Sequence, residues 1–193
     1  MIFGKNPSYR LFLALFIAPC AWCKEPAAIS ILEVLKPPKQ PLTMHFREEK
    51  RLQILNQPLK SHGLLRFIPP DTLVRKEDGW RDISYRIEGD QVSISEGERV
   101  LRQFDLGLSP GVAAIATTLR ALLAADIQTL EKHYTLTLTG SSSEWTLLLT
   151  PRDKPASQFV KKVLIDGGNG RITAVDTYEQ NGDRSHMMLM PDG

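Results

Sequence analysis

Residues 109–130 read SPGVAAIATTLRALLAADIQTL, and their apolar side chains recur every three or four positions. This spacing places the apolar side chains along one side of a helix. A serine followed by a proline opens the segment, which is typical of a helix start because serine caps the free N–H groups and proline suits the first turn. We expect a bend at residues 124–125 and a second short helix that begins at Asp126.

Short strands are predicted on both sides of this helical segment. Runs that alternate between apolar and polar residues are divided by turn residues, which indicates antiparallel strands joined by hairpins. The predicted strands cover residues 43–55, 62–68, 72–76, 82–88, 91–95, 100–106, 134–139, 144–150, 159–165, 171–179 and 184–190. A short helix over residues 26–35 precedes them. The sequence therefore predicts an α+β fold of mainly antiparallel β structure with about ten strands.

A sheet of about ten strands in a chain of this size has to curl or close. We expect a curled or closed sheet whose inserted helices form a lid over an apolar concave face. The side chains predicted to line this interior are Leu65, Phe67, Leu73, Ile83, Tyr85, Ile94, Leu119, Leu122, Leu123, Trp145, Leu147 and Leu149. The same residues suit ordinary core packing, and only an interior left partly unfilled would make them a binding surface.

Residues 1–23 have the features of a secretory signal peptide. Lys5 and Arg10 precede the apolar run LFLALFIA at residues 11–18. This run is far shorter than the roughly 20 apolar residues that a membrane-spanning helix needs. We therefore expect an exported chain that begins at Lys24 and forms one domain over residues 24–193.

Export would change both the charge and the cysteine content. Lys5 and Arg10 would be removed with no acidic residue, which leaves 22 basic and 22 acidic residues. Without net charge, the chain has no overall field to hold a polyanion, so a nucleic-acid partner is not expected. Cys20 and Cys23 would be removed as well, which excludes disulfides and cysteine chemistry. Lipidation at Cys20 is the less favoured alternative, because Pro19 stands where such sites usually have Gly, Ala or Ser.

No motif predicts a catalytic residue, a metal site or a cofactor. Residues 167–170 (GGNG) precede a strand, so no helix N-terminus backs an anion there. Residues 141–143 (SSS) lack the frame of a strained nucleophile turn. The alternating charges of residues 48–51 indicate a solvent-exposed edge. The histidines lie at spacings that do not suit a metal, and they are His45, His62, His133 and His186.

Several short stretches have the order and spacing of a known family. They are Phe46 with Glu48, GLLRF at residues 63–67 followed by PDTL at 70–73, WTLLLTP at 145–151 and GDRS at 182–185. Over residues 42–190 the chain resembles the periplasmic outer-membrane lipoprotein carrier (LolA-like) family, particularly its divergent branch. The resemblance implies an N-terminal helix and an incomplete antiparallel barrel, with helices inserted mid-sheet to cover an apolar cavity. It also implies a periplasmic carrier that shields the acyl chains of a lipoprotein or lipid and delivers them toward the outer membrane.

The partners implied by this resemblance are an acylated lipoprotein or lipid cargo, an inner-membrane donor protein and an outer-membrane acceptor protein. We expect transient membrane contact, a monomer and no enzymatic activity. Two alternatives remain: a lipid-sensing regulatory domain on the same fold, and an exported hydrolase whose residues are not recognised. The sequence departs from the family at Pro69, where better-known carriers have an arginine that hydrogen-bonds the lid. The nearest arginines are Arg66 and Arg75, so the family's gating mechanism does not transfer directly.

Overall fold

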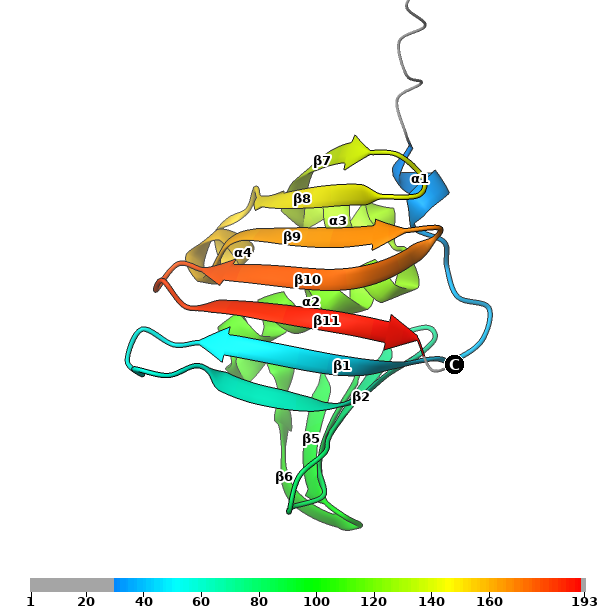
Figure 1. Cartoon of the computed structure of the whole chain (residues 1–193). Coiled ribbons are helices and arrows are strands. Elements are labelled where there is room, and N and C mark those ends of the chain that lie inside the picture. The colour runs from blue at the N-terminus through cyan, green and yellow to red at the C-terminus, as the bar shows by residue number, and fades with distance from the viewer. Residues whose placement is uncertain (1–29, 192–193) are drawn as a thin grey trace, which may run out of the picture.

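The fold is described from a computed structural model, which covers residues 30–191 (Figure 1). The predicted signal peptide over residues 1–23 lies outside these residues. Within them, eleven strands form one antiparallel sheet in the order β6-β5-β4-β3-β2-β1-β11-β10-β9-β8-β7. The strands are β1 (Leu42–Arg51), β2 (Leu59–Ile68), β3 (Thr72–Glu77), β4 (Ile83–Glu88), β5 (Gln91–Glu96), β6 (Arg99–Asp105), β7 (Tyr134–Gly140), β8 (Trp145–Pro151), β9 (Val160–Gly168), β10 (Arg171–Glu179) and β11 (Arg184–Pro191).

The sheet is curled but not closed, which confirms the predicted incomplete barrel. β6 and β7 form its two edges, and the chain between them runs through the inserted helices. The longest helix, α2, lies against the concave face of the sheet (Figure 1). The helical elements are α1 (Ile31–Val34), the 3₁₀ helix η1 (Leu106–Leu108), α2 (Pro110–Ala124), α3 (Ile127–His133) and α4 (Lys154–Phe159).

The inserted helices begin and end where their sequence indicates. Pro110 is the first residue of α2, although the Ser109 side chain makes no capping hydrogen bond. Ala125 ends the helix in a left-handed conformation with φ 53°, which produces the predicted bend. The Asp126 side chain then accepts a hydrogen bond from the Thr129 backbone N–H at 3.0 Å and caps α3.

Three local expectations differ from the structure. The strand predicted over residues 43–55 ends at Arg51, because residues 52–58 form a loop whose Gln53 N–H donates to Asp183. Within the described part of the predicted N-terminal helix, only Ile31–Val34 is helical. The helix α4 was not predicted; it is capped by Asp153, whose carboxylate accepts from the backbone N–H of Ala156.

The hydrophobic core lies between the concave face of the sheet and the inserted helices. Alternation along β1 and β2 directs Phe46, Leu65 and Phe67 into this core, and each is at most 1% exposed. The neighbouring residues on the same strands, such as His45 and Arg66, lie on the convex face and are exposed. Across residues 30–191, no helix has the length and apolar character needed to span a bilayer.

Candidate functional site

Half of the predicted lining residues form the buried floor of the concave face. They are 0–5% exposed and are Leu65, Phe67, Leu73, Trp145, Leu147 and Leu149. None of them lines the three apolar cavities described below. The indole of Trp145 lies over Gly167, and its buried Nε1 finds no hydrogen-bond acceptor in the described part of the chain.

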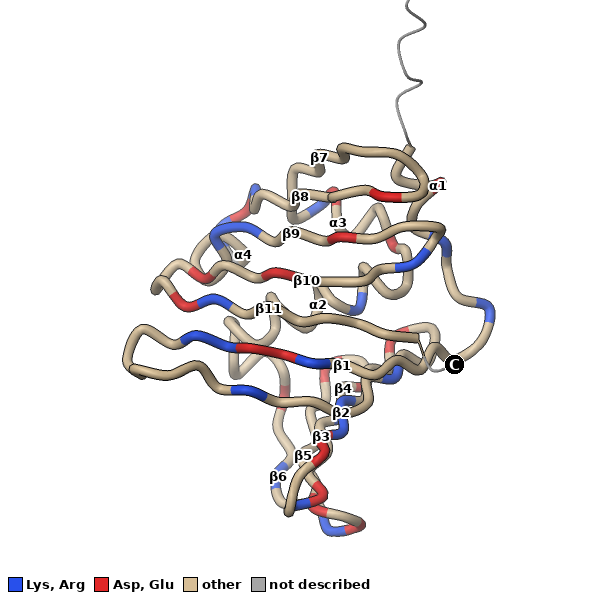
Figure 2. Tube along the Cα trace, viewed as in Figure 1, with Lys and Arg blue, Asp and Glu red and all other residues tan. Residues whose placement is uncertain are grey.

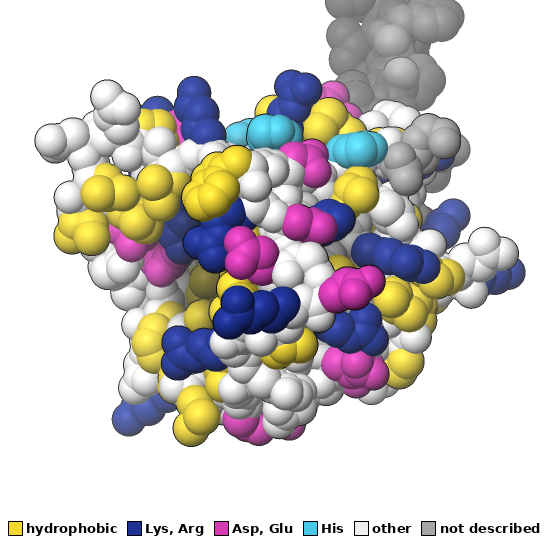
Figure 3. All heavy atoms as spheres, turned by 90° about the horizontal axis from the view of Figure 1, so that it is seen from below, with side chains coloured by type: hydrophobic (Ala, Val, Ile, Leu, Met, Phe, Trp, Pro, Cys, Tyr) yellow, Lys and Arg dark blue, Asp and Glu magenta, His cyan; other side chains and the backbone are white. Residues whose placement is uncertain are grey.

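A second group of predicted residues lies on the part of the sheet that extends beyond α2. Ile83 and Tyr85 on β4 and Ile94 on β5 are partly exposed, and Tyr85 stands opposite Ile94 in the ladder. Strands β3–β6 curve away from the helices at this end of the sheet (Figure 1). Seen from below, hydrophobic side chains gather in patches between charged groups on the surface (Figure 3). These three residues are therefore only partly covered, and none of them lines the three cavities described below.

The third group, on α2, borders two cavities. Leu119 and Leu122 line a small central cavity of about 90 Å³, whose other walls come from strands β1, β9, β10 and β11. Leu122 and Leu123 line an end cavity of about 470 Å³, whose outer wall is the segment from α1 to the start of β1. An outer cavity of about 250 Å³ is lined by α2, α3, α4 and the start of β7.

These cavities follow α2 along its length. Leu122 lines both the central and the end cavity, while Thr118 lines both the central and the outer cavity. Apolar clefts therefore border α2 on several sides, although Leu122 and Leu123 themselves are only 2% and 3% exposed. The central cavity is well below the roughly 300–1,000 Å³ of a typical ligand pocket, so a shift of α2 would be needed to join the cavities into one larger space.

The outer cavity contains one buried polar contact. The hydroxyl oxygens of Thr118 and Tyr134 lie 2.6 Å apart, and Thr118 also donates to the Ala114 carbonyl. Burial raises the pKa of Tyr134 above its ordinary value, so the phenol stays protonated at neutral pH. At the same cavity, His133 Nδ1 lies 2.5 Å from an oxygen of Asp153. Within residues 30–191, no group of ligand side chains is arranged to hold a metal.

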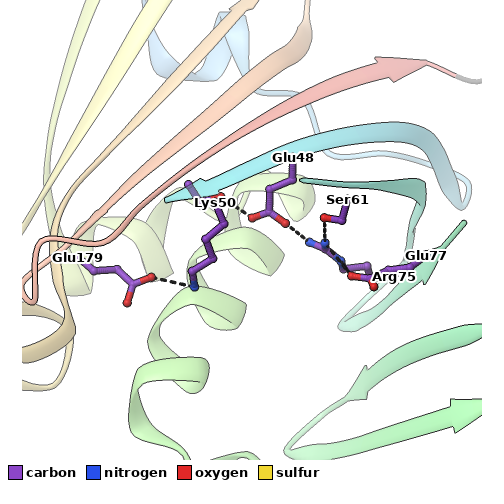
Figure 4. Close-up of polar contacts among 7 residues, drawn as sticks. Glu48, Lys50, Ser61, Arg75, Glu77 and Glu179 are labelled. Atoms are coloured by element: carbon purple, nitrogen blue, oxygen red, sulfur yellow. Dashed lines mark hydrogen bonds and ion pairs between the residues drawn. The ribbon is translucent and has the colours of Figure 1, made fainter. Parts of the chain in front are cut away.

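One end of the concave face carries charged side chains, which corrects the prediction that residues 48–51 form a solvent-exposed edge. β1 lies between β2 and β11, so Glu48 and Lys50 share the concave face with Phe46 and line the central cavity. The Lys50 Nζ is 3.1 Å from an oxygen of Glu179 (Figure 4). The period-two alternation from Phe46 could have revealed this placement.

Arg75 connects these charges to the neighbouring strands (Figure 4). Its guanidinium donates to Glu48 at 2.6 Å, to Ser61 at 2.8 Å and to Glu77 at 3.0 Å. It also lies 4.2 Å from the centre of the Phe46 ring. The interior is thus apolar at its centre and carries mutually neutralised charges at this end.

In this protein the arginine that connects the lid to the sheet lies on the lid helix. Arg75 is held by side chains of the sheet, and Arg66 is exposed on β2. Arg120 on α2 donates to the carbonyl oxygen of Gly89 at 2.6 Å and approaches that of Asp71 at 3.4 Å. Arg120 therefore ties the lid helix to the β4–β5 turn and to the corner between β2 and β3, a contact that sequence reasoning missed.

Comparisons with known proteins find one matching family model and similar solved structures. The family model described as outer membrane lipoprotein carrier protein LolA-like matches residues 24–191. A crystal structure of a LolA superfamily protein from Nitrosomonas europaea is similar at 11% identity and a TM-score of 0.41, covering 84% of this chain and 91% of that one. A putative outer membrane lipoprotein-sorting protein domain from Vibrio parahaemolyticus is similar at 9% identity and a TM-score of 0.41, covering 78% and 83%. A search of curated proteins finds no match. Because the family model spans most of the sequence, the chain belongs to the LolA-like family of outer membrane lipoprotein carrier proteins.

Proposed function

We propose that this protein is a periplasmic carrier that shields the acyl chains of a lipoprotein or lipid and delivers them toward the outer membrane. Each methylene group of an acyl chain costs about 0.8 kcal/mol in water, so a chain of about 16 carbons costs roughly 12 kcal/mol. Such a cargo needs an apolar container to cross an aqueous compartment. Family membership and the apolar concave face support this proposal.

The observation that carries the proposal is the series of cavities around α2. α2 borders clefts of about 90, 250 and 470 Å³ that open to the surface and are lined mainly by apolar atoms. Apolar space therefore lies beside α2 on several sides, next to the face of the helix that packs on the sheet. We propose that cargo enters when α2 shifts, and that Leu119 and Leu122 then contact the acyl chain together with the predicted floor of the sheet.

Native mass spectrometry of the protein recovered after export, followed by lipid extraction, tests the proposal. A carrier retains a lipid or takes up a fluorescent acyl probe, and it passes that probe to acceptor vesicles. Binding without transfer, together with a stable protein partner, would favour the lipid-sensing alternative. Turnover of an ester or glycoside would favour the hydrolase.

A pair of variants on α2 separates cavity binding from surface adsorption. Leu119→Gln places a polar group in the central cavity and should lower acyl-probe affinity about tenfold, in line with the loss of one buried aliphatic contact. Val112→Gln is the control, because Val112 is 48% exposed on the same helix and lines none of the three cavities. Equal effects of the two substitutions would contradict binding beneath the lid.

A further inference from the structure

A polar bowl of about 590 Å³ lies where β1, β9, β10 and β11 end on one side of the sheet. Its walls are the loop of residues 52–58 and the turn of residues 180–183, and Arg51, Lys161 and Arg184 line it. In Figure 2 these ends of the strands carry several basic residues. The bowl also adjoins the central cavity, because Glu179 lines both.

Two arginines face each other across the ladder at the bowl, which is unfavourable for the stability of the sheet. Arg51 and Arg184 are directly opposite each other on β1 and β11, an arrangement that destabilises a sheet when the charges are alike. Glu49 neutralises Arg51 at 2.8 Å, whereas Arg184 has no ion pair or side-chain hydrogen bond within the described residues. An anion bound between the two strands would remove this repulsion.

A β-bulge adds a second uncompensated cation. Tyr178 pairs with Lys162 and the next residue, Glu179, pairs with Val160, so Lys161 is left without a partner in the ladder. Bulges commonly redirect a side chain next to a functional site. Lys161 lines the bowl and, like Arg184, makes no ion pair with any described residue.

The acidic side chains of the bowl already have hydrogen-bond or ion-pair partners. Asp183 accepts from the backbone N–H of Gln53 at 2.7 Å and from the side-chain amide of Asn181 at 2.8 Å. Glu179 pairs with Lys50 at 3.1 Å. Asp183 keeps its negative charge because both of its donors are neutral, but the unpaired Arg184 and Lys161 outnumber it. The net charge left for a ligand is therefore positive, and an anionic group fits it.

Exposed aliphatic side chains lie beside these cations. Ile54 is 88% exposed, and Leu55 and Leu59 are 43% and 51% exposed in the same loop region. Aliphatic residues next to basic ones are typical of surfaces that enter the interface of an anionic bilayer. Trp80 is exposed in the loop between β3 and β4, but its basic neighbours are paired: Lys76 with Asp82 and Arg81 with Glu96.

We propose that the bowl and the loop of residues 52–58 form a docking surface for anionic phospholipid membranes. Arg184 and Lys161 bind the lipid phosphate, and Ile54 and Leu55 enter the interfacial layer. The surface goes beyond the proposed carrier function, since docking does not require the interior to bind acyl chains. Because the bowl adjoins the central cavity, docking also places that cavity close to the bilayer.

Co-sedimentation with vesicles tests this surface. The exported protein should bind vesicles of phosphatidylcholine mixed with phosphatidylglycerol and should bind pure phosphatidylcholine weakly. Each basic residue near an anionic surface contributes about a factor of five to affinity, so the combined substitutions Arg184→Ala and Lys161→Ala should lower it about thirtyfold. Ile54→Ser should lower it about tenfold. Trp80→Ser is the control and should leave binding unchanged.

Three results would overturn the proposal. The first is no preference for anionic vesicles, and the second is loss of binding with Trp80→Ser but not with Ile54→Ser. The third is that soluble inorganic phosphate binds the protein while anionic vesicles do not. That result would make the bowl a site for a small anion. Acyl-probe uptake is measured on the same variants, so a failure of docking is distinguished from a failure of the carrier function.

Discussion

Replacing Arg120 with alanine should loosen the lid while leaving the sheet intact. The substitution removes the hydrogen bond from the guanidinium to the Gly89 carbonyl at 2.6 Å, and with it the longer approach to Asp71 at 3.4 Å. A hydrogen bond from a charged donor contributes about 1.5–3 kcal/mol. Arg120 is only partly buried, so we take the lower end of this range, about 1.5 kcal/mol. That corresponds to roughly a tenfold change in the ratio of closed to open lid.

Hydrogen exchange of the α2 amides and the rate of acyl-probe uptake measure this change. In Arg120→Ala, exchange of the α2 amides and probe uptake should both accelerate about tenfold, while exchange in β8–β11 stays unchanged. Arg66→Ala is the matched control, because Arg66 is exposed on β2 and its side chain makes no hydrogen bond, ion pair or ring contact with any described residue. If α2 exchanges at the same rate in Arg120→Ala and Arg66→Ala, Arg120 does not hold the lid and the reasoning is refuted.

Three other substitutions have defined outcomes in urea unfolding. Gly167→Ala should destabilise the fold by about 1–3 kcal/mol, because the new Cβ would lie 2.2 Å from the Trp145 ring. Gly79→Ala should be neutral, because its Cβ would meet only the Arg81 carbonyl oxygen at 3.8 Å, an ordinary contact distance. Burial raises the pKa of Tyr134, so the protonated phenol contributes fully to the free energy of unfolding below about pH 10. This contribution is lost as the pH rises through the folded pKa, and Tyr134→Phe should remove that alkaline loss of stability. Asp126→Ala removes the cap of α3 and should cost about 1 kcal/mol, and an unchanged unfolding midpoint would argue against the cap.

The fold could be predicted because its signals are local. The period-two alternation identifies each strand, and the helical spacing of residues 109–130 identifies the insertion between β6 and β7. Hairpin residues such as Asn181-Gly182 then connect neighbouring strands in the observed order. The short helix α4 was missed because its six residues carry no apolar repeat, and a helix of this length is stabilised mainly by packing.

The candidate site could be predicted only in part, because it depends on contacts between distant segments. Alternation places Leu147 and Leu149 on the concave face, but it does not say whether neighbours fill the space in front of them. Arg120 contacts backbone carbonyls of Gly89 and Asp71, and carbonyl positions leave no signal in the sequence. Lys161 is directed by a bulge that only the paired strands reveal.

The separation of β6 and β7 in the sheet determines how the molecule can expand. In a closed barrel, widening the lumen would require hydrogen bonds between strands to break all along one pair. Here the two edge strands are joined through η1, α2 and α3, and no ladder between them has to be broken. Expansion to accept a bulky ligand would therefore disrupt side-chain packing and the Arg120 hydrogen bond. All ten pairs of neighbouring strands would keep their backbone hydrogen bonds. The gap between β6 and β7 can therefore widen without unpairing any strand.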